Sequence, residues 1–215
     1  MIIKYLGDYN DLVEELKYDV HLIGMVIEFI KLKLDDYVSY KQKIDKTNEI
    51  RDNKKLIEMS HEERIDLFMF TLIDSNLCGG YMAEMLCVHI YTIAEEYLNK
   101  ICTLLVTERE INNILKKERC SNIMAYKLVL DSKNIKNSNS KYFQELDVLR
   151  KIRNAIIHNR GELSEKDVNL VSKYVSVDDI NNVCVGIDDA NRFLVFFEVY
   201  MSNIFQEINL IIKNS

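Results

Sequence analysis

The chain has no proline among its 215 residues and only six glycines. Proline kinks or ends a helix and glycine weakens one, and both residues dominate the turns that an all-β fold needs. Leu, Ile, Lys and Glu are plentiful, a composition that suits long uninterrupted helices. We therefore predict an all-α protein built as an elongated bundle of long antiparallel helices.

The size of the chain allows one sizeable hydrophobic core. Apolar residues make up 48% of the sequence, and no Gly/Ser-rich or Pro-rich linker divides it. A chain of this length can form one domain or two small ones. Because no linker is visible, we predict one compact domain, in which a helical region at 1–78 packs on a core at 79–215.

Several segments carry apolar residues every three to four positions, the period of an amphipathic helix. In the longest of them, between 11 and 46, these residues include Leu12, Leu16, Ile23, Ile27 and Ile30. We predict helices over 11–46, 60–73, 81–106, a segment after 107, 122–130, 143–157, 164–174 and 188–213. A short apolar run at 183–187 is predicted to be extended, and 132–140 to be a polar loop.

Local capping signals set the boundaries of these helices. A Ser or Thr followed three residues later by an acidic residue is typical of a helix start, and it occurs at Ser60, Thr107 and Ser164. Gly161 is expected to end the helix at 143–157, since glycine is favoured just beyond a helix C-terminus. The pair Gly79-Gly80 is expected to separate two helices.

The cysteines and the apolar runs indicate a cellular setting. The five cysteines are odd in number and form no Cys-x-x-Cys pair, so we expect small core residues in a reducing cytosol; they are Cys78, Cys87, Cys102, Cys120 and Cys184. The amino terminus does not resemble a signal peptide, and no run approaches the roughly 18 apolar residues of a membrane span. We predict a cytoplasmic protein without a membrane partner.

The formal net charge of −6 argues against a protein that coats nucleic acid through a general basic field. One segment differs from the rest. Five basic residues stand against two acidic ones between positions 141 and 160, a local balance of +3; they are Lys141, Arg150, Lys151, Arg153 and Arg160, against Glu145 and Asp147. A solvated helix face and a local anion-binding surface are both open at this point.

The same segment contains the one pattern that suggests chemistry, Arg153-Asn154 followed four residues later by His158. The asparagine makes this string much rarer by chance than Arg and His at the same spacing. Helix geometry predicts a polar stripe and, opposite it, a core face. The stripe holds Asp147, Lys151, Asn154 and His158, and the core face holds Leu146, Leu149, Ile152 and Ile156.

Arg153 lies about 140° from His158 around an ideal helix. We expect this offset to be too large for both side chains to contact the same atom comfortably. Two arrangements would bring them together. The helix can unwind at Ile157-His158, or the site can be assembled across a two-fold axis from two motif helices. For such an interface, Ile157 and Phe143 are the candidate apolar contacts.

Arg-Asn-x-x-x-His near the end of an amphipathic helix, followed by Asn159-Arg160-Gly161, resembles the HEPN superfamily. The segment 88–100 is similar to the companion helix of such bundles, so the resemblance covers 81–213. It implies a helical bundle whose dimer forms a composite RNA-cleaving site without metal or cofactor. Carried over by position, the catalytic set is Arg153, Asn154 and His158, and the RNA-binding set is Arg150, Lys151, Asn159 and Arg160.

The chemistry of these residue types fits such a site. RNA carries its own 2′-hydroxyl nucleophile, histidine transfers protons near neutral pH, and arginine offers a fork of donors to phosphate oxygens. The implied products are a 2′,3′-cyclic phosphate and a 5′-hydroxyl. The resemblance further implies a toxin or phage-defence effector that cuts transfer or messenger RNA, with an antitoxin or defence protein as a possible partner.

A second class of function stays open from the sequence. Some members of the superfamily have lost cleavage, so the chain can also be a catalytically silent dimer that binds a protein or a nucleotide. A subset of its toxins carries a His-x-Tyr target for nucleotidylation, but the tyrosine position is Arg160 here. That mode of regulation is therefore not expected.

Other polar residues give weaker signals. His21, His61 and His89 each stand alone, and His89 is expected to be packed within its helix. The pair Glu95-Glu96 is either a solvated pair or an acidic partner of the basic stripe. No metal-binding spacing and no phosphate-binding loop is present.

Overall fold

The computed structural model describes residues 6–48, 76–135 and 141–213. Helices dominate all three parts, which confirms the predicted all-α class. The described elements are, in order, α1 (Leu6–Asn48), α3 (Asn76–Leu105), α4 (Glu108–Glu118), α5 (Asn122–Ser132), α6 (Lys141–Asn159), α7 (Glu165–Val171), β1 (Ser176–Val177), β2 (Val183–Cys184) and α8 (Ile187–Lys213). The predicted helix at 60–73 and its cap lie outside the described residues, as does most of the predicted loop at 132–140.

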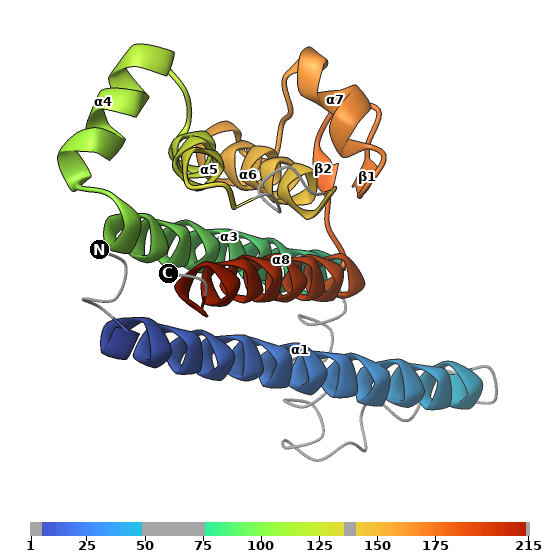
Figure 1. Cartoon of the computed structure of the whole chain (residues 1–215). Helices are drawn as coiled ribbons and strands as arrows, with labels where there is room; N and C mark the ends of the chain where they lie inside the picture. The colour runs from blue at the N-terminus through green and yellow to red at the C-terminus, as the bar shows by residue number, and fades with distance from the viewer. Residues whose placement is uncertain (1–5, 49–75, 136–140, 214–215) are drawn as a thin grey trace.

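The helices stack in layers (Figure 1). α3 and α8 form the middle layer, α1 packs on one side of it, and α5 and α6 cover the other. Both α3 and α8 end near the start of α1, so α1 runs antiparallel to them, whereas α3 and α8 run in the same direction. The expectation that all long helices are antiparallel is therefore wrong for this central pair.

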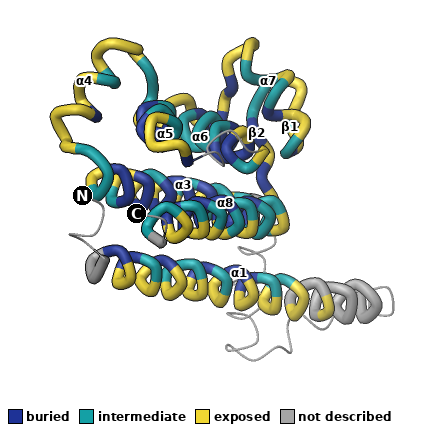
Figure 2. Tube along the Cα trace, viewed as in Figure 1, coloured by how far each residue is buried: buried dark blue, intermediate teal, exposed yellow. Residues whose placement is uncertain are grey.

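One continuous apolar core joins these layers. The middle layer packs against α1 on one side and against α5 and α6 on the other, and it contributes buried side chains along its length (Figure 2). Its fully buried side chains include Ile90, Leu98 and Phe193, and α1 contributes Ile27. Each such side chain stabilises the fold by about 1.5–3 kcal/mol relative to an exposed position.

Specific polar contacts fix α1 on the middle layer. The Tyr9 hydroxyl donates to the backbone oxygen of Phe205 at 2.9 Å, near the end of α8. The Tyr97 hydroxyl on α3 donates to Asp19 Oδ2 at 2.8 Å. These contacts join the first half of α1 to the last turns of its two neighbours, as an antiparallel arrangement requires.

Some predicted boundaries are confirmed and others are wrong. Thr107 caps α4 with a complete capping box, in which Glu110 Oε2 accepts from the Thr107 backbone N–H at 2.8 Å. However, α3 begins at Asn76 and continues through Gly79-Gly80. Glycine inside a helix costs only about 1 kcal/mol relative to alanine, and the burial of the rest of α3 exceeds this cost.

The end of α6 is formed by two residues with positive φ. Arg160 has φ +54° and Gly161 has φ +94°, and the Gly161 N–H donates to the Ala155 oxygen at 2.9 Å, as in a Schellman motif. Gly161 thus ends the helix as predicted, although the first left-handed residue is Arg160. The chain then enters α7, which stops at Val171 rather than at the predicted 174, and the short hairpin β1–β2.

The cysteines are only partly as predicted. Cys87 and Cys102 are buried core residues, whereas Cys120 is half-buried and Cys184 is exposed. All four are free thiols, and the side chain of Cys78 lies outside the described residues. Within the described part of the chain, no helix is both long enough and apolar enough to span a membrane.

Candidate functional site

The Arg-Asn-x-x-x-His pattern occupies the last two turns of α6, where the helix emerges from the core. The inward face of α6 is anchored by Leu149 and Ile152, which are fully buried, and by Ala155. The predicted core face is thereby confirmed, with Ile156 half-buried at its edge. This anchoring fixes the backbone that carries the polar residues.

Three motif side chains meet in one cluster. Arg153 Nη1 lies 3.1 Å from His158 Nε2 and donates to Asn154 Oδ1 at 3.0 Å. A guanidinium has donors but no acceptor, so this contact is a hydrogen bond in the tautomer of His158 that accepts at Nε2 and carries its proton on Nδ1. The His158 end of the cluster is exposed to solvent.

The expected separation of Arg153 and His158 is wrong. The helix continues through Asn159 without unwinding, and no second chain is needed for the contact. The 140° offset describes only the directions of the two Cα–Cβ bonds. The arginine side chain is long enough to span this offset. That side chain bends around the helix past Asn154 and reaches the imidazole five residues ahead.

Tyr91 on α3 packs against the guanidinium of Arg153. The guanidinium of Arg153 lies 5.9 Å from the centre of the Tyr91 ring, within the range of a cation–π contact. Tyr91 is only 4% exposed. Burial, assisted by the nearby carboxylate of Glu95 and opposed by Arg150 and Arg153, raises the pKa of the Tyr91 phenol. The ring is therefore neutral and presents an intact π face.

One atom of Arg153 has no hydrogen-bond partner. Its Nε is buried and unpaired, whereas Nη1 makes both polar contacts described above. An unpaired buried donor on a charged group is costly. The guanidinium is therefore held in place by the aliphatic part of the side chain, by the Tyr91 ring and by the two contacts of Nη1. These contacts do not use all of its N–H donors.

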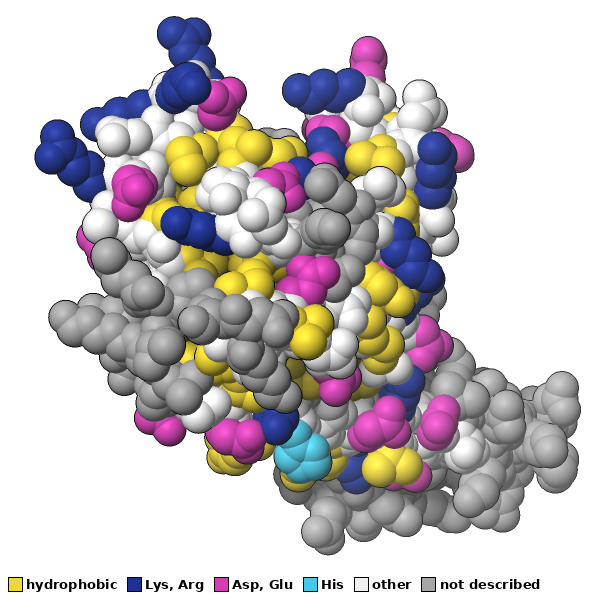
Figure 3. All heavy atoms as spheres, viewed as in Figure 1, with side chains coloured by type: hydrophobic (Ala, Val, Ile, Leu, Met, Phe, Trp, Pro, Cys, Tyr) yellow, Lys and Arg dark blue, Asp and Glu magenta, His cyan; other side chains and the backbone are white. Residues whose placement is uncertain are grey.

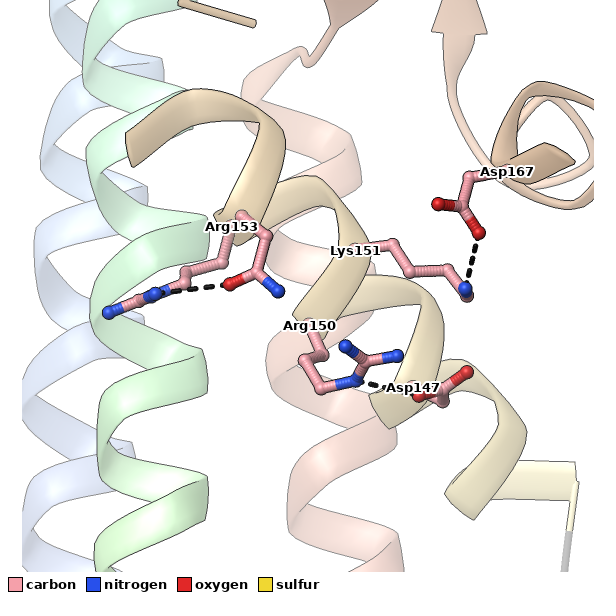
Figure 4. Close-up of polar contacts among 6 residues, drawn as sticks. Asp147, Arg150, Lys151, Arg153 and Asp167 are labelled. Atoms are coloured by element: carbon pink, nitrogen blue, oxygen red, sulfur yellow. Dashed lines mark hydrogen bonds and ion pairs between the residues drawn. The ribbon is translucent and has the colours of Figure 1, made fainter. Parts of the chain in front are cut away.

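Two members of the predicted RNA-binding set are engaged in ion pairs (Figure 4). Arg150 Nε donates to Asp147 Oδ1 at 2.8 Å, and Lys151 Nζ donates to Asp167 on α7. Burial raises the pKa of the Asp167 carboxyl, but hydrogen bonds from Lys151 and Ser164 outweigh it, so the pKa is below its ordinary value. The Lys151–Asp167 pair thus ties α7 to α6.

The other two members of the RNA-binding set, Asn159 and Arg160, are exposed at the end of α6. Basic side chains also gather over α4 and α7, interspersed with acidic ones (Figure 3). On α7 and just after it these are Lys166 and Lys173, both exposed. The free positive charge near the motif therefore lies around its C-terminal end rather than along the whole predicted stripe.

Phe143 and Glu145, both in the predicted basic segment, are also buried. Phe143 is 6% exposed and lies 6.3 Å, centre to centre, from the Tyr200 ring, so it cannot serve a dimer interface as expected. Ile157 is 46% exposed and keeps that possibility. Glu145 is 8% exposed, and burial raises the pKa of its carboxyl against the opposing effects of Lys141 and Arg192.

The weaker candidates have clear places in the fold. His89 is exposed on α3 rather than packed, and His21 is exposed on α1, while His61 lies outside the described residues. Glu95 accepts from Asn122 Nδ2 at 2.6 Å, and Glu96 pairs with Lys100 at 3.0 Å. Neither glutamate forms a hydrogen bond or an ion pair with the basic residues of α6.

Sequence reasoning missed Tyr91 as part of the site. Its position in α3 matches the apolar period of that helix, as the position of a packing residue would, and only the three-dimensional contact with Arg153 distinguishes it. Among the residues that the structure describes, no three His, Cys, Asp or Glu side chains are grouped so as to hold a metal ion.

Comparisons with known proteins identify no counterpart, since no protein-family model matches the sequence and neither a curated protein nor a solved structure shows a significant similarity to the chain.

Proposed function

We propose that the chain is a metal-independent endoribonuclease whose catalytic residues are Arg153, Asn154 and His158. The observation that carries this proposal is the 3.1 Å contact between Arg153 Nη1 and His158 Nε2 at an exposed helix end. The contact joins a fixed positive charge to a proton-transfer group, which are the two functions that RNA cleavage by its own 2′-hydroxyl requires. The motif's resemblance to HEPN ribonucleases agrees with this assignment.

In the proposed reaction, a phosphate of the RNA takes the place of His158 as the partner of Arg153. This exchange frees the Nε2 lone pair, which then accepts the proton of the 2′-hydroxyl as that oxygen attacks phosphorus. Arg153 stabilises the charge that develops on the phosphorane oxygens, and Asn154 fixes the guanidinium through Oδ1. The departing 5′-oxygen takes a proton from water and the imidazolium of His158 returns its proton to the solvent, giving a 2′,3′-cyclic phosphate and a 5′-hydroxyl.

The proposal is tested by incubating purified protein with total RNA and identifying the ends of the fragments. His158→Ala and Arg153→Ala should each lower cleavage by about 10²–10⁴-fold, the usual effect of losing one acid–base group or charge stabiliser. His89→Ala is the matched control, because His89 is exposed on a different helix. Cleavage should persist in EDTA, and a 2′-O-methyl group at the cut position should block it.

Equal cleavage by wild type and His158→Ala, or complete dependence on an added divalent metal, would contradict this mechanism. The proposed biological role, a toxin or phage-defence effector acting on transfer or messenger RNA under control of a partner protein, rests on the family resemblance. The alternative is a silent dimer that binds a protein or nucleotide. It is favoured by the ion pairs that engage Arg150 and Lys151, and it gains weight if the wild type cleaves no RNA.

We also propose that the active form is a two-fold homodimer that brings two copies of the α6 end to one groove. Ile157 lies beside His158 and is 46% exposed, which leaves an apolar side chain at the rim of a polar site. Ile157→Asp should both convert the dimer to a monomer and lower RNA cleavage. Val195→Asp on α8, which has the same exposed fraction, is the control. A stable monomer at micromolar concentration that retains activity would refute this arrangement.

A further inference from the structure

A small polar pocket lies beside the motif, between the C-terminal half of α6 and the start of α7. Its volume is about 160 Å³. Both walls carry hydrogen-bonding side chains, of which those that matter here are Asn154, Asn159, Glu162, Ser164, Lys166 and Asp167. None of them belongs to an aromatic residue, so a ligand would be recognised by its edges rather than by stacking.

The pocket shares one residue, Asn154, with the proposed catalytic cluster. Asn154 lines it, and the Oδ1 of the same residue accepts from Arg153 Nη1, the atom that also contacts His158. His158 follows Asn154 by four residues, one helical turn, and therefore lies on the same face of α6. A group bound in the pocket would sit one turn from the imidazole.

The walls of the pocket are held in place by internal contacts. Asp167 accepts from Lys151 and, at 2.6 Å, from the hydroxyl of Ser164. The Leu163 N–H donates to the Asn181 oxygen at 2.9 Å, which fixes the segment between the helices. Because the pocket is preformed, little conformational entropy is lost when a ligand binds, as is typical of recognition sites.

The size of the pocket limits its ligand. Pockets for whole small molecules usually have roughly 300–1,000 Å³, so this one is too small for a complete nucleotide and suits a single ring system or a small anion. Its charges decide between the two. Three cations line the pocket, Arg150, Lys151 and Lys166, together with the carboxylates of Glu162 and Asp167. Arg150 is paired with Asp147 and Lys151 with Asp167, so the charges outside these ion pairs are one carboxylate, Glu162, and one ammonium, Lys166. A phosphodiester has no donor for the Glu162 carboxylate, whereas a ligand with both donors and acceptors matches the two groups.

A nucleobase matches this lining because its edge presents N–H donors and carbonyl or ring-nitrogen acceptors together. We propose that the pocket between α6 and α7 binds one nucleobase of the RNA adjacent to the cleaved bond and thereby sets the sequence preference of cleavage. This inference rests on the proposed ribonuclease function. Asn159, Glu162 and Lys166 are the residues that read the base edge, and Asn154 links base binding to the placement of Arg153.

The first test measures cleavage of a random-sequence RNA library by sequencing the fragment ends. Wild type should prefer one base next to the cut. Asn159→Ala and Lys166→Ala should reduce that preference, the ratio of kcat/KM for the preferred base to kcat/KM for the other three bases, by about tenfold. Lys173→Ala is the control, since Lys173 is exposed beyond the end of α7 and outside the pocket.

The second test detects binding without cleavage. The four free nucleosides and, in a separate titration, inorganic phosphate are added to His158→Ala protein, and backbone amide chemical shifts are followed by NMR. One nucleoside should shift the amides of Asn159 and Ser164, and Asn159→Ala should weaken that shift. Shifts caused by phosphate alone would show an anion site and overturn the proposal.

The two tests separate this inference from the proposed function. Cleavage by wild type with a preference that Asn159→Ala and Lys166→Ala leave unchanged would refute the base pocket and leave the ribonuclease proposal standing. Absence of cleavage together with nucleoside binding at the pocket would refute the ribonuclease proposal and retain a nucleobase site.

Discussion

At the scale of single residues, Arg153 is held by three different interactions. Its Nη1 contacts both His158 and Asn154, and its guanidinium lies over the Tyr91 ring. A lysine would keep the charge but could not keep a planar fork, so these contacts select arginine. The placement of the charge therefore depends on α3 as well as on α6.

This dependence gives a prediction for Tyr91. Tyr91→Phe keeps the ring and should retain most RNA cleavage, whereas Tyr91→Leu removes the π face and should lower kcat by roughly 10-fold with a smaller change in KM. The physical reason is that a cation–π contact of about 1–2 kcal/mol orients the guanidinium. Single-turnover kinetics and thermal melts of both variants separate this effect from instability. Equal kinetics for Phe and Leu would show that the ring has only a packing role.

The sequence was informative about the site where chemistry is local to one helix. Arg153, Asn154 and His158 do meet, and Leu149 and Ile152 do face the core. Two things could not be predicted from α6 alone. The reach of the arginine depends on side-chain torsions that a helical wheel ignores, and the role of Tyr91 depends on how α3 crosses α6.

At the scale of elements, the end of α6 carries backbone strain at a predicted RNA-binding residue. Arg160 has φ +54°, a left-handed conformation that costs an L-residue roughly 1–2 kcal/mol. A glycine would usually occupy this position. Strain retained at an exposed arginine is consistent with selection for the side chain rather than for stability.

Arg160→Gly should therefore raise the free energy of unfolding, by up to about 1 kcal/mol after the entropy cost of glycine, and should lower RNA cleavage. Arg119→Gly is a matched control, since Arg119 has φ 47° at the end of α4. It should be stabilised in the same way without losing activity. Urea denaturation and the cleavage assay measure the two effects, and unchanged cleavage by Arg160→Gly would exclude Arg160 from RNA binding.

Element boundaries were predictable where a cap chemically defines them. Thr107 with Glu110 begins α4, and Gly161 ends α6. Gly79-Gly80 misled because glycine only weakens a helix, and tertiary packing decides whether the helix continues. The first strand of the hairpin, β1, has two residues and no alternating pattern long enough to be recognised.

At the scale of the whole molecule, the core contains several ionisable side chains whose pKa is raised by burial. Burial raises the pKa of Tyr9 and Tyr126 to about 12. Burial also raises the pKa of the Cys87 and Cys102 thiols to about 12, with Asp189 and Glu84 contributing at Cys87. These four groups come from α1, α3 and α5, so the two interfaces that join the layers contain groups that must stay protonated.

This composition predicts unfolding at high pH. Below about pH 9 both states keep these protons, so the four groups give no pH dependence. Between their unfolded pKa values, 9 for Cys and 10 for Tyr, and about 12, the unfolded chain releases protons first and stability falls. Each group contributes up to about 1.4 kcal/mol per pH unit, and the sum over the four groups is comparable to a total stability of about 5–15 kcal/mol.

Helix content should therefore be lost before pH 12, which circular dichroism with a reductant present can follow. Tyr126→Phe should shift the transition to higher pH. Ionisation of Tyr126 near pH 10 with the helices intact, measured as the difference in tyrosinate absorbance between wild type and Tyr126→Phe, would show that this phenol is not buried.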